Sequence, residues 1–182
     1  MKTESTVKYV LRIALTLLAI TAVVAVILAA VNSVTAPRIA AQNEQKTQAA
    51  IEAVLPGGGQ EVTFTDDTGL VTAAYKGDNG CAVQVTPAGF NGAVTMMVGV
   101  DNDGKVTGIS IISHAETSGL GAKAAAASEY GDWWRGQFVG TGDDVALTKY
   151  GGTIDSITAA TITSNAVAGA VAESIKAVES LG

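Results

Sequence analysis

The chain has 182 residues and a formal net charge of −6, a length that suits one domain with an appended segment. Hydrophobic residues make up 48% of it but aromatic residues only 5%, so we expect a core of small and β-branched side chains. Beyond Pro37 the chain carries eight Lys and Arg residues against sixteen Asp and Glu, which argues against a nucleic-acid partner. The lone cysteine, Cys81, excludes an intramolecular disulfide and any multi-cysteine metal site within the chain, so a redox function would require an organic cofactor or a partner's metal.

An uncharged apolar segment near the N-terminus predicts a membrane anchor. The 19 residues from Ile13 to Val31 are almost all apolar, and no charged residue occurs between Ile13 and Pro37. At about 1.5 Å per residue this run can cross a bilayer as a helix. A cleaved signal peptide has a shorter apolar region of about 7–15 residues and ends in a small-residue cleavage site. Here the apolar run is longer, and the candidate cleavage site, Val34-Thr35-Ala36, is followed by Pro37, which makes cleavage unfavourable. We therefore expect an uncleaved transmembrane helix over residues 13–35.

The charges that flank the anchor predict its orientation. Lys2, Lys8 and Arg12 precede it, and only Arg38 and Lys46 follow closely. Positive charge favours the cytoplasmic side. The prediction is a single-pass protein of the cell (inner) membrane, with residues 1–12 in the cytoplasm and the domain on the extracytoplasmic side.

A stalk and then a sheet are expected after the anchor. Residues 38–55 are rich in helix formers, and the run from Pro56 to Gly59 predicts a flexible joint that closes a stalk over residues 36–60. From Glu61 the apolar period changes to two, which is typical of antiparallel strands. We predict an α+β domain over residues 61–182, with helix-forming sequence at 124–129 and strands at 61–65, 70–75, 81–87, 93–100, 106–113 and 145–147.

The turn at residues 101–104 resembles the start of a calcium-binding loop. That loop needs a third oxygen ligand at its fifth position and Glu at its twelfth, and these positions hold Lys105 and Ile112. The turn is therefore read as a hairpin connection, and no metal site is predicted.

A polar, glycine-rich loop follows the last long strand, at residues 113–123. Part of it, GLGAKA, fits a relaxed dinucleotide fingerprint, but that motif works inside a parallel βαβ unit and the strand here reads as one arm of a hairpin. His114 is the only histidine, and a structural hydrogen bond is the commoner role for a lone histidine.

The segment DSITAATITS, residues 155–164, places several hydroxyl groups and two alanines in front of an amphipathic helix over residues 165–178. Thr163 or Ser164 is the expected cap. A helix N-terminus stabilises an anion, above all a phosphate, through free backbone N–H groups and a partial positive charge. The alternative is an ordinary strand-to-helix turn with a good cap.

Taken together, these stretches resemble the FMN-binding domain of the Rnf and sodium-pumping quinone reductase complexes. The anchor, the stalk, the pattern GFNGAVTMMVGVDNDGKVTGISII, the loop HAETSGLG and the segment DSITAATITS occur in the family's order. The length is close to that of the Rnf G subunits, and the related C subunits of the quinone reductases are typically longer.

The resemblance implies FMN bound covalently. In this family a separate flavin transferase joins the phosphate of FMN to a threonine in a motif D-x-x-(S/T)-G-A-T. Asp155, Thr158, Ala160 and Thr161 match it, so Thr161 is the expected attachment point and Asp155 the expected recognition residue for the transferase. Ala159 replaces the usual glycine, and alanine is strained if the backbone there needs a positive φ. In the loop, Ser118 stands where proline is common.

The resemblance also implies two walls around the flavin. Leu120 is expected to pack on a ring face, and Lys123 to stabilise an anionic reduced flavin or the phosphate. The residues expected to contact the cofactor are Glu116, Thr117, Gly119, Leu120, Gly121, Lys123, Thr158, Ala159, Ala160 and Ser164.

The implied function is a membrane-anchored subunit that relays electrons through covalent FMN in an ion-translocating ferredoxin:NAD oxidoreductase, with the other subunits of that complex as partners. No residue of this chain is expected to act as a catalytic acid, base or nucleophile. The alternatives are a quinone-reductase C-type or stand-alone covalent-flavin subunit and, in another class, a non-redox surface-tethered interaction domain.

Overall fold

The computed structural model of the chain describes residues 3–64, 69–142 and 144–181. Thr65, the end of the first predicted strand, lies outside these ranges, as do Met1, Lys2 and Gly182. The elements, in chain order, are α1 (Thr3–Val54), β1 (Gln60–Val62), β2 (Val71–Gly77), β3 (Gly80–Val85), β4 (Val94–Asp101), β5 (Val106–His114), the 3₁₀ helix η1 (Gly121–Ala124), α2 (Glu129–Gly136), the 3₁₀ helix η2 (Thr148–Tyr150) and α3 (Thr161–Leu181).

The chain divides into two compact units, residues 1–44 and 45–182. The described part of the first unit is a single helical stretch of α1, which continues through Pro37. Large apolar side chains from Val7 to Ile39 are exposed along it. By length and composition this helix can cross a membrane, in agreement with the predicted anchor.

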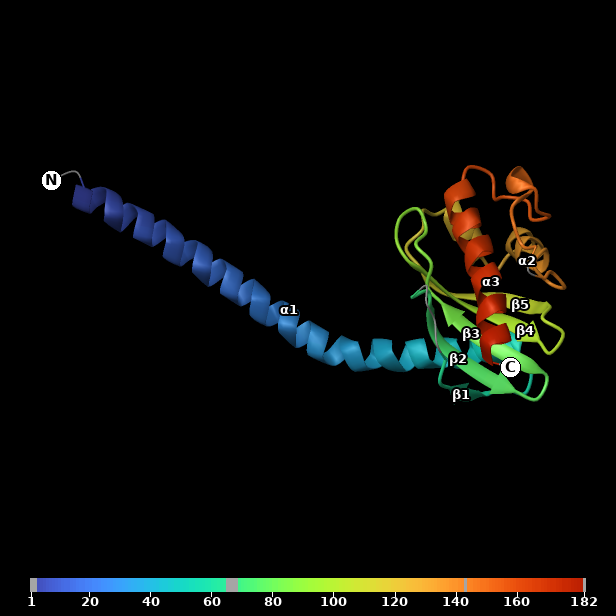
Figure 1. The fold of residues 1–182 in the computed structure, drawn as a ribbon. Coiled ribbons are helices and arrows are strands. Elements are labelled where there is room, and N and C mark those ends of the chain that lie inside the picture. The colour runs from blue at the N-terminus through green and yellow to red at the C-terminus, as the bar shows by residue number, and fades with distance from the viewer. Residues whose placement is uncertain (1–2, 65–68, 143, 182) are drawn as a thin grey trace. The chain divides into compact units, whose positions relative to one another are not determined.

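The second unit is built on a five-stranded antiparallel sheet in which each strand pairs with the next along the chain, in the order β1-β2-β3-β4-β5 (Figure 1). Because side chains alternate between the faces of a strand, β3 and β4 contribute to two separate clusters. Val83 and Val98 belong to the larger core, and Ala82 and Met97 belong to the smaller. The sheet is therefore covered on both faces, and the predicted α+β class is confirmed.

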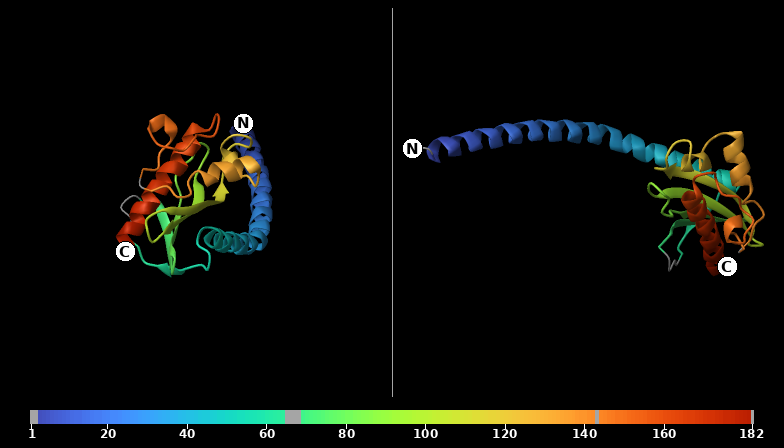
Figure 2. Two further views of the ribbon diagram at one scale, coloured as in Figure 1. Left: turned by 90° about the vertical axis from the view of Figure 1, so that its right-hand side faces the viewer. Right: turned by 90° about the horizontal axis from the view of Figure 1, so that it is seen from above.

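The smaller cluster is closed by the last turns of α1. Ile51, Val54 and Leu55 are buried against Ala82 and Met97, on the face of the sheet opposite α3 (Figure 2). The Gly58 N–H donates to the Leu55 carbonyl over 2.9 Å. The helix end is thus part of the domain core, and the glycine run that follows it begins in a hydrogen-bonded turn.

The larger core lies between the sheet and the C-terminal half of the chain. Val167, Val171 and Ile175 of α3, at spacings of four residues, are buried against the sheet, as the predicted stripe requires. Trp134 of α2 and Phe138 are fully buried beside them, with ring centroids 5.2 Å apart. This packing holds α3 against β3 and β4, and α2 against β5.

Three local predictions were wrong. Helix α3 begins at Thr161 rather than at residue 165, so Thr163 and Ser164 lie in its first turn instead of capping it. The helix expected at residues 124–129 starts only at Glu129, where the Ser128 hydroxyl accepts a hydrogen bond from Gly131 N–H over 3.2 Å. The strand expected at residues 145–147 is reduced to one parallel bridge, between Leu147 and Ile154.

Candidate functional site

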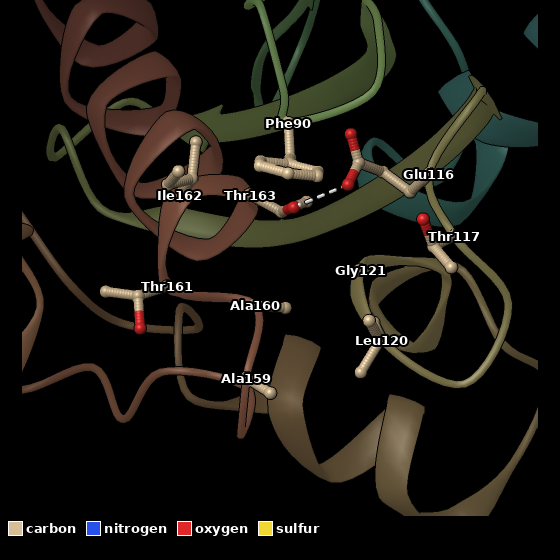
Figure 3. A pocket seen from close by; sticks show the side chains of 10 residues that line it. All are labelled: Phe90, Glu116, Thr117, Leu120, Gly121, Ala159, Ala160, Thr161, Ile162 and Thr163. Carbon is tan, nitrogen blue, oxygen red and sulfur yellow. Dashed lines mark hydrogen bonds between the residues drawn. The ribbon is translucent and has the colours of Figure 1, made fainter.

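A pocket of about 330 Å³ lies between the loop that follows β5 and the first turn of α3 (Figure 3). The two unusual stretches of the sequence therefore meet, although they lie far apart along the chain. The β3–β4 connection supplies a third side. The lining residues are Phe90, Glu116, Thr117, Leu120, Gly121, Ala159, Ala160, Thr161, Ile162 and Thr163.

The first turn of α3 forms one wall. The Ser164 N–H donates to the Ala160 carbonyl over 3.0 Å, within the helical pattern. The N–H groups of Thr161, Ile162 and Thr163 precede it, and such groups in a first turn have no acceptor within the helix. They carry the positive end of the dipole of a 21-residue helix. This wall suits an anionic group, and the half-buried Thr161 presents a hydroxyl beside it.

The backbone at Ala159 has a conformation that favours glycine. Ala159 has a φ of +61° and is the one non-glycine residue with a positive φ in the described part of the chain. A residue with a β-carbon is destabilised by about 1–2 kcal/mol in this left-handed conformation. The family motif has glycine here, which adopts it without strain. The sequence therefore identified the position correctly as one where alanine is strained.

Glu116 joins the other two walls to α3. The residue is 8% exposed. Its Oε2 accepts a hydrogen bond from the Thr163 hydroxyl over 2.6 Å (Figure 3), and its Oε1 accepts one from the Asn91 N–H over 3.0 Å. Burial raises the pKa of the Glu116 carboxyl, but the hydrogen bonds from Thr163 and from the backbone at Asn91 and Phe90, with the charge of His114, outweigh it and leave the pKa below its ordinary value. Glu116 is thus a buried carboxylate at neutral pH.

Gly121 allows this close approach. A β-carbon at Gly121 would lie 2.7 Å from the Thr163 hydroxyl oxygen and nearer still to Glu116 Oε2. Gly89 plays a similar part on the opposite side, where a β-carbon would lie 2.9 Å from the Gly92 carbonyl oxygen. The glycines therefore leave room for the carboxylate and for the walls that it connects.

Three exposed apolar side chains surround the pocket. Phe90 is 68% exposed, Ile162 58% and Leu120 40%, and all three line it. Large apolar side chains exposed at the edge of a pocket offer contact area to a planar apolar ligand. The pocket thus combines an apolar rim with an anion-stabilising helix start.

The structure brings most of the predicted contact residues to this pocket, but not all of them. Four lie elsewhere. Gly119 forms a turn with a φ of +78°, Thr158 is exposed, and the Lys123 ammonium lies 5.5 Å from the centre of the Tyr130 ring. Ser164 is buried, where its hydroxyl donates to the Ala160 carbonyl over 2.9 Å and accepts from Ile157 N–H over 3.0 Å.

Asp155, the expected recognition residue, is exposed and outside the pocket lining. Its backbone is held from α2 and the residue after it. The Trp134 indole N–H donates to the Asp155 carbonyl over 2.8 Å, and the Asp155 N–H donates to Gln137 Oε1 over the same distance. The carboxyl side chain therefore projects from a fixed backbone.

Sequence reasoning missed Phe90, Ile162 and Thr163. Ile162 and Thr163 stood inside the segment that was singled out, but the helix was expected to start later. Phe90 lies between Gly89 and Asn91, with Gly92 next in the chain. A large aromatic residue in so glycine-rich a loop was the signal that could have identified it.

Comparison with known proteins bears directly on this site. Residues 89–176 match the FMN-binding domain family, and residues 1–54 match the RnfG N-terminal region. The chain is 33% identical to the G subunit of the Na(+)-translocating ferredoxin:NAD(+) oxidoreductase complex of Acetobacterium woodii, covering 96% of this chain and 94% of that protein. It is 38% identical to the G subunit of the proton-translocating ferredoxin:NAD(+) oxidoreductase complex of Clostridium ljungdahlii, covering 84% and 83%, and 36% identical to the G subunit of the ion-translocating oxidoreductase complex of Yersinia pestis, covering 79% and 78%.

The chain belongs to the family of Rnf-complex G subunits. It is accordingly an electron-transfer subunit of a multi-subunit oxidoreductase, and FMN is its cofactor. The FMN-binding match covers every residue that lines the pocket.

The pocket residues fit this cofactor. FMN has an apolar, planar ring system and an anionic phosphate, and the pocket offers exposed apolar side chains and the N-terminal turn of α3. Gly121 keeps the wall between them open, because a β-carbon there would collide with Glu116 and Thr163.

Proposed function

We propose that the chain relays electrons within an ion-translocating ferredoxin:NAD oxidoreductase through FMN joined by its phosphate to Thr161. The observation that carries the attachment site is the position of the Thr161 hydroxyl. It stands at the first residue of α3, on the wall of the pocket. A phosphoester there places the remaining phosphate charge at the positive end of the helix dipole.

Bound FMN supplies the redox chemistry, and the residues of this chain hold and surround it. Attachment would form a bond from Thr161 Oγ1 to the flavin phosphorus as the bond from that phosphorus to a leaving group breaks. With a flavin dinucleotide as the donor, the leaving group would be the nucleoside monophosphate, and the Thr161 proton would pass to it. The N–H groups of the first turn face the phosphate charge, Leu120 and Phe90 offer apolar contact to the ring system, and Glu116 holds the walls together. A separate flavin transferase that recognises the segment around Asp155 makes the bond.

The membrane-spanning part of α1 anchors this relay. Lys2, Lys8 and Arg12 precede the apolar run, and only Arg38 and Lys46 follow it closely. This excess of positive charge favours a cytoplasmic N-terminus and an extracytoplasmic domain. Labelling of Cys81 is unsuitable for testing this, because Cys81 is buried. A cysteine introduced at the exposed Ala127, in a Cys81→Ala background, would react with a membrane-impermeant maleimide in intact cells if the domain lies outside.

The attachment is tested by in-gel ultraviolet fluorescence of the denatured full chain from its native host, where the transferase is present. The wild-type band and a Thr161→Ser band should fluoresce, because both retain a hydroxyl, and Thr161→Ala should be dark. Thr148→Ala, a threonine outside the pocket lining, is the matched control and should stay fluorescent. A dark wild-type band would refute covalent attachment.

Two other observations weigh the alternatives. The names of the relatives support a G subunit over a quinone-reductase C subunit. A non-redox interaction domain would hold no flavin at all, so a native protein without flavin absorbance before denaturation would favour that class.

A further inference from the structure

The charge of the pocket has a sign that the sequence did not predict. Among the described residues that line it, Glu116 is the sole charged side chain. Lys123, expected to face the cofactor as a cation, instead has its ammonium over the Tyr130 ring. A ligand in this pocket therefore meets a carboxylate, with no lysine or arginine among the described lining residues to offset it.

From this placement we infer that Glu116 is a positioning residue whose negative charge lowers the midpoint potential of the flavin. The inference rests on the proposed function, because it requires FMN in this pocket. The carboxylate is built into the wall: it is 8% exposed and held by the Thr163 hydroxyl and the Asn91 N–H at 2.6 and 3.0 Å. It cannot swing into solvent without losing both hydrogen bonds.

The direction follows from charge balance. Reduction of a flavin adds two electrons, taken from a donor subunit in the complex or from dithionite in a titration, and one or two protons follow. With one proton the ring system gains a net negative charge, which a nearby fixed carboxylate disfavours. With two protons it gains none. Glu116 thus opposes reduction to the anionic form and makes the flavin a stronger reductant.

The size of the pocket makes the effect measurable. A sphere with the pocket's volume of about 330 Å³ has a diameter of roughly 9 Å. A ligand inside the pocket therefore lies within about 10 Å of the Glu116 carboxylate in its wall. Two unit charges about 10 Å apart at an effective dielectric constant of about 20 change an equilibrium constant by about tenfold. The low pKa of Glu116 supports the inference, since the group stays ionised at neutral pH.

The test is a spectroelectrochemical titration of the flavin-loaded full chain in detergent at pH 7. Glu116→Gln removes the charge and keeps the shape: its amide oxygen can accept from Asn91 N–H and its NH₂ group can donate to the Thr163 hydroxyl. The expected result is a more positive midpoint potential, equivalent to about a tenfold change in the oxidised-to-reduced ratio at a fixed potential. Glu129→Gln, which removes an exposed charge outside the pocket, should leave the potential unchanged.

A second variant covers the case in which Glu116→Gln does not fold. Leu120→Lys adds a cation at a residue that is 40% exposed and lines the same pocket, and it leaves the Glu116 hydrogen bonds in place. It should also make the potential more positive. If flavin-loaded Glu116→Gln has an unchanged or more negative potential, the inference is overturned and the proposed function still stands. If only Leu120→Lys folds, an unchanged potential in that variant has the same consequence. A wild-type chain without flavin would overturn both.

Discussion

Replacing Ala159 by glycine should stabilise the domain, which is the reverse of the usual effect of an alanine-to-glycine change. The left-handed backbone at Ala159, with a φ of +61°, costs a residue with a β-carbon about 1–2 kcal/mol. Glycine removes that cost but gives the unfolded chain more freedom, worth about 0.4–1 kcal/mol. The difference predicts a gain of about 0.5–1 kcal/mol. At about 4 °C per kcal/mol for a domain of this size, the melting temperature should rise by roughly 2–4 °C.

The gain can be measured by urea unfolding of the flavin-free full chain in detergent, followed by tryptophan fluorescence. Trp134 is fully buried and Trp133 is 51% exposed, so unfolding of the domain changes the environment of Trp134 most. The matched control is Ala127→Gly, an exposed alanine whose φ is not positive, which should lose about 0.4–1 kcal/mol. Equal losses in both variants would refute the strain at Ala159.

Three further predictions concern the core and the carboxylate. The pKa of Glu116 is lowered in the folded state, so its ionised form stabilises the fold at pH values above its ordinary pKa of about 4.5. That stability is lost as the pH falls through the lower pKa of the folded state. Urea unfolding measured over this acidic pH range should therefore show less destabilisation by acid in Glu116→Gln than in the wild type. Gly99→Ala should cost about 1–3 kcal/mol by thermal unfolding, since the new β-carbon would lie 2.9 Å from Val54 Cβ, and an unchanged melting temperature would contradict the packing of α1 on the sheet. Trp134→Phe should cost about 1–3 kcal/mol by urea unfolding, because the Asp155 carbonyl loses its 2.8 Å donor.

The sheet could be predicted from the sequence because its pattern is local. Alternating apolar residues and Gly, Asp or Asn boundaries located β2 to β5 to within a few residues. The sequence did not reveal that the end of α1 packs on the sheet: Ile51 and Val54 meet Met97 more than 40 residues away, and no local period records such a contact.

The pocket was predictable in its two halves but not in its details. The family motif pointed to Thr161 and to the loop with Glu116, which the fold brings to one pocket. The start of α3 was misplaced because hydroxyl residues often cap helices, whereas the Thr163 hydroxyl instead donates to Glu116, 47 residues away. The direction of Lys123 depends on Tyr130, a neighbour that only the folded chain supplies.

The packing of α1 on the sheet decides where the chain can be cut. The family matches end at residue 54 and resume at residue 89, which invites a soluble fragment that starts at the glycine run. Such a fragment would leave Ala82 and Met97, both fully buried in the intact chain, open to water and prone to aggregation. A fragment that starts at Gln45, where the second compact unit begins, retains Ile51, Val54 and Leu55 and with them the cover of that face.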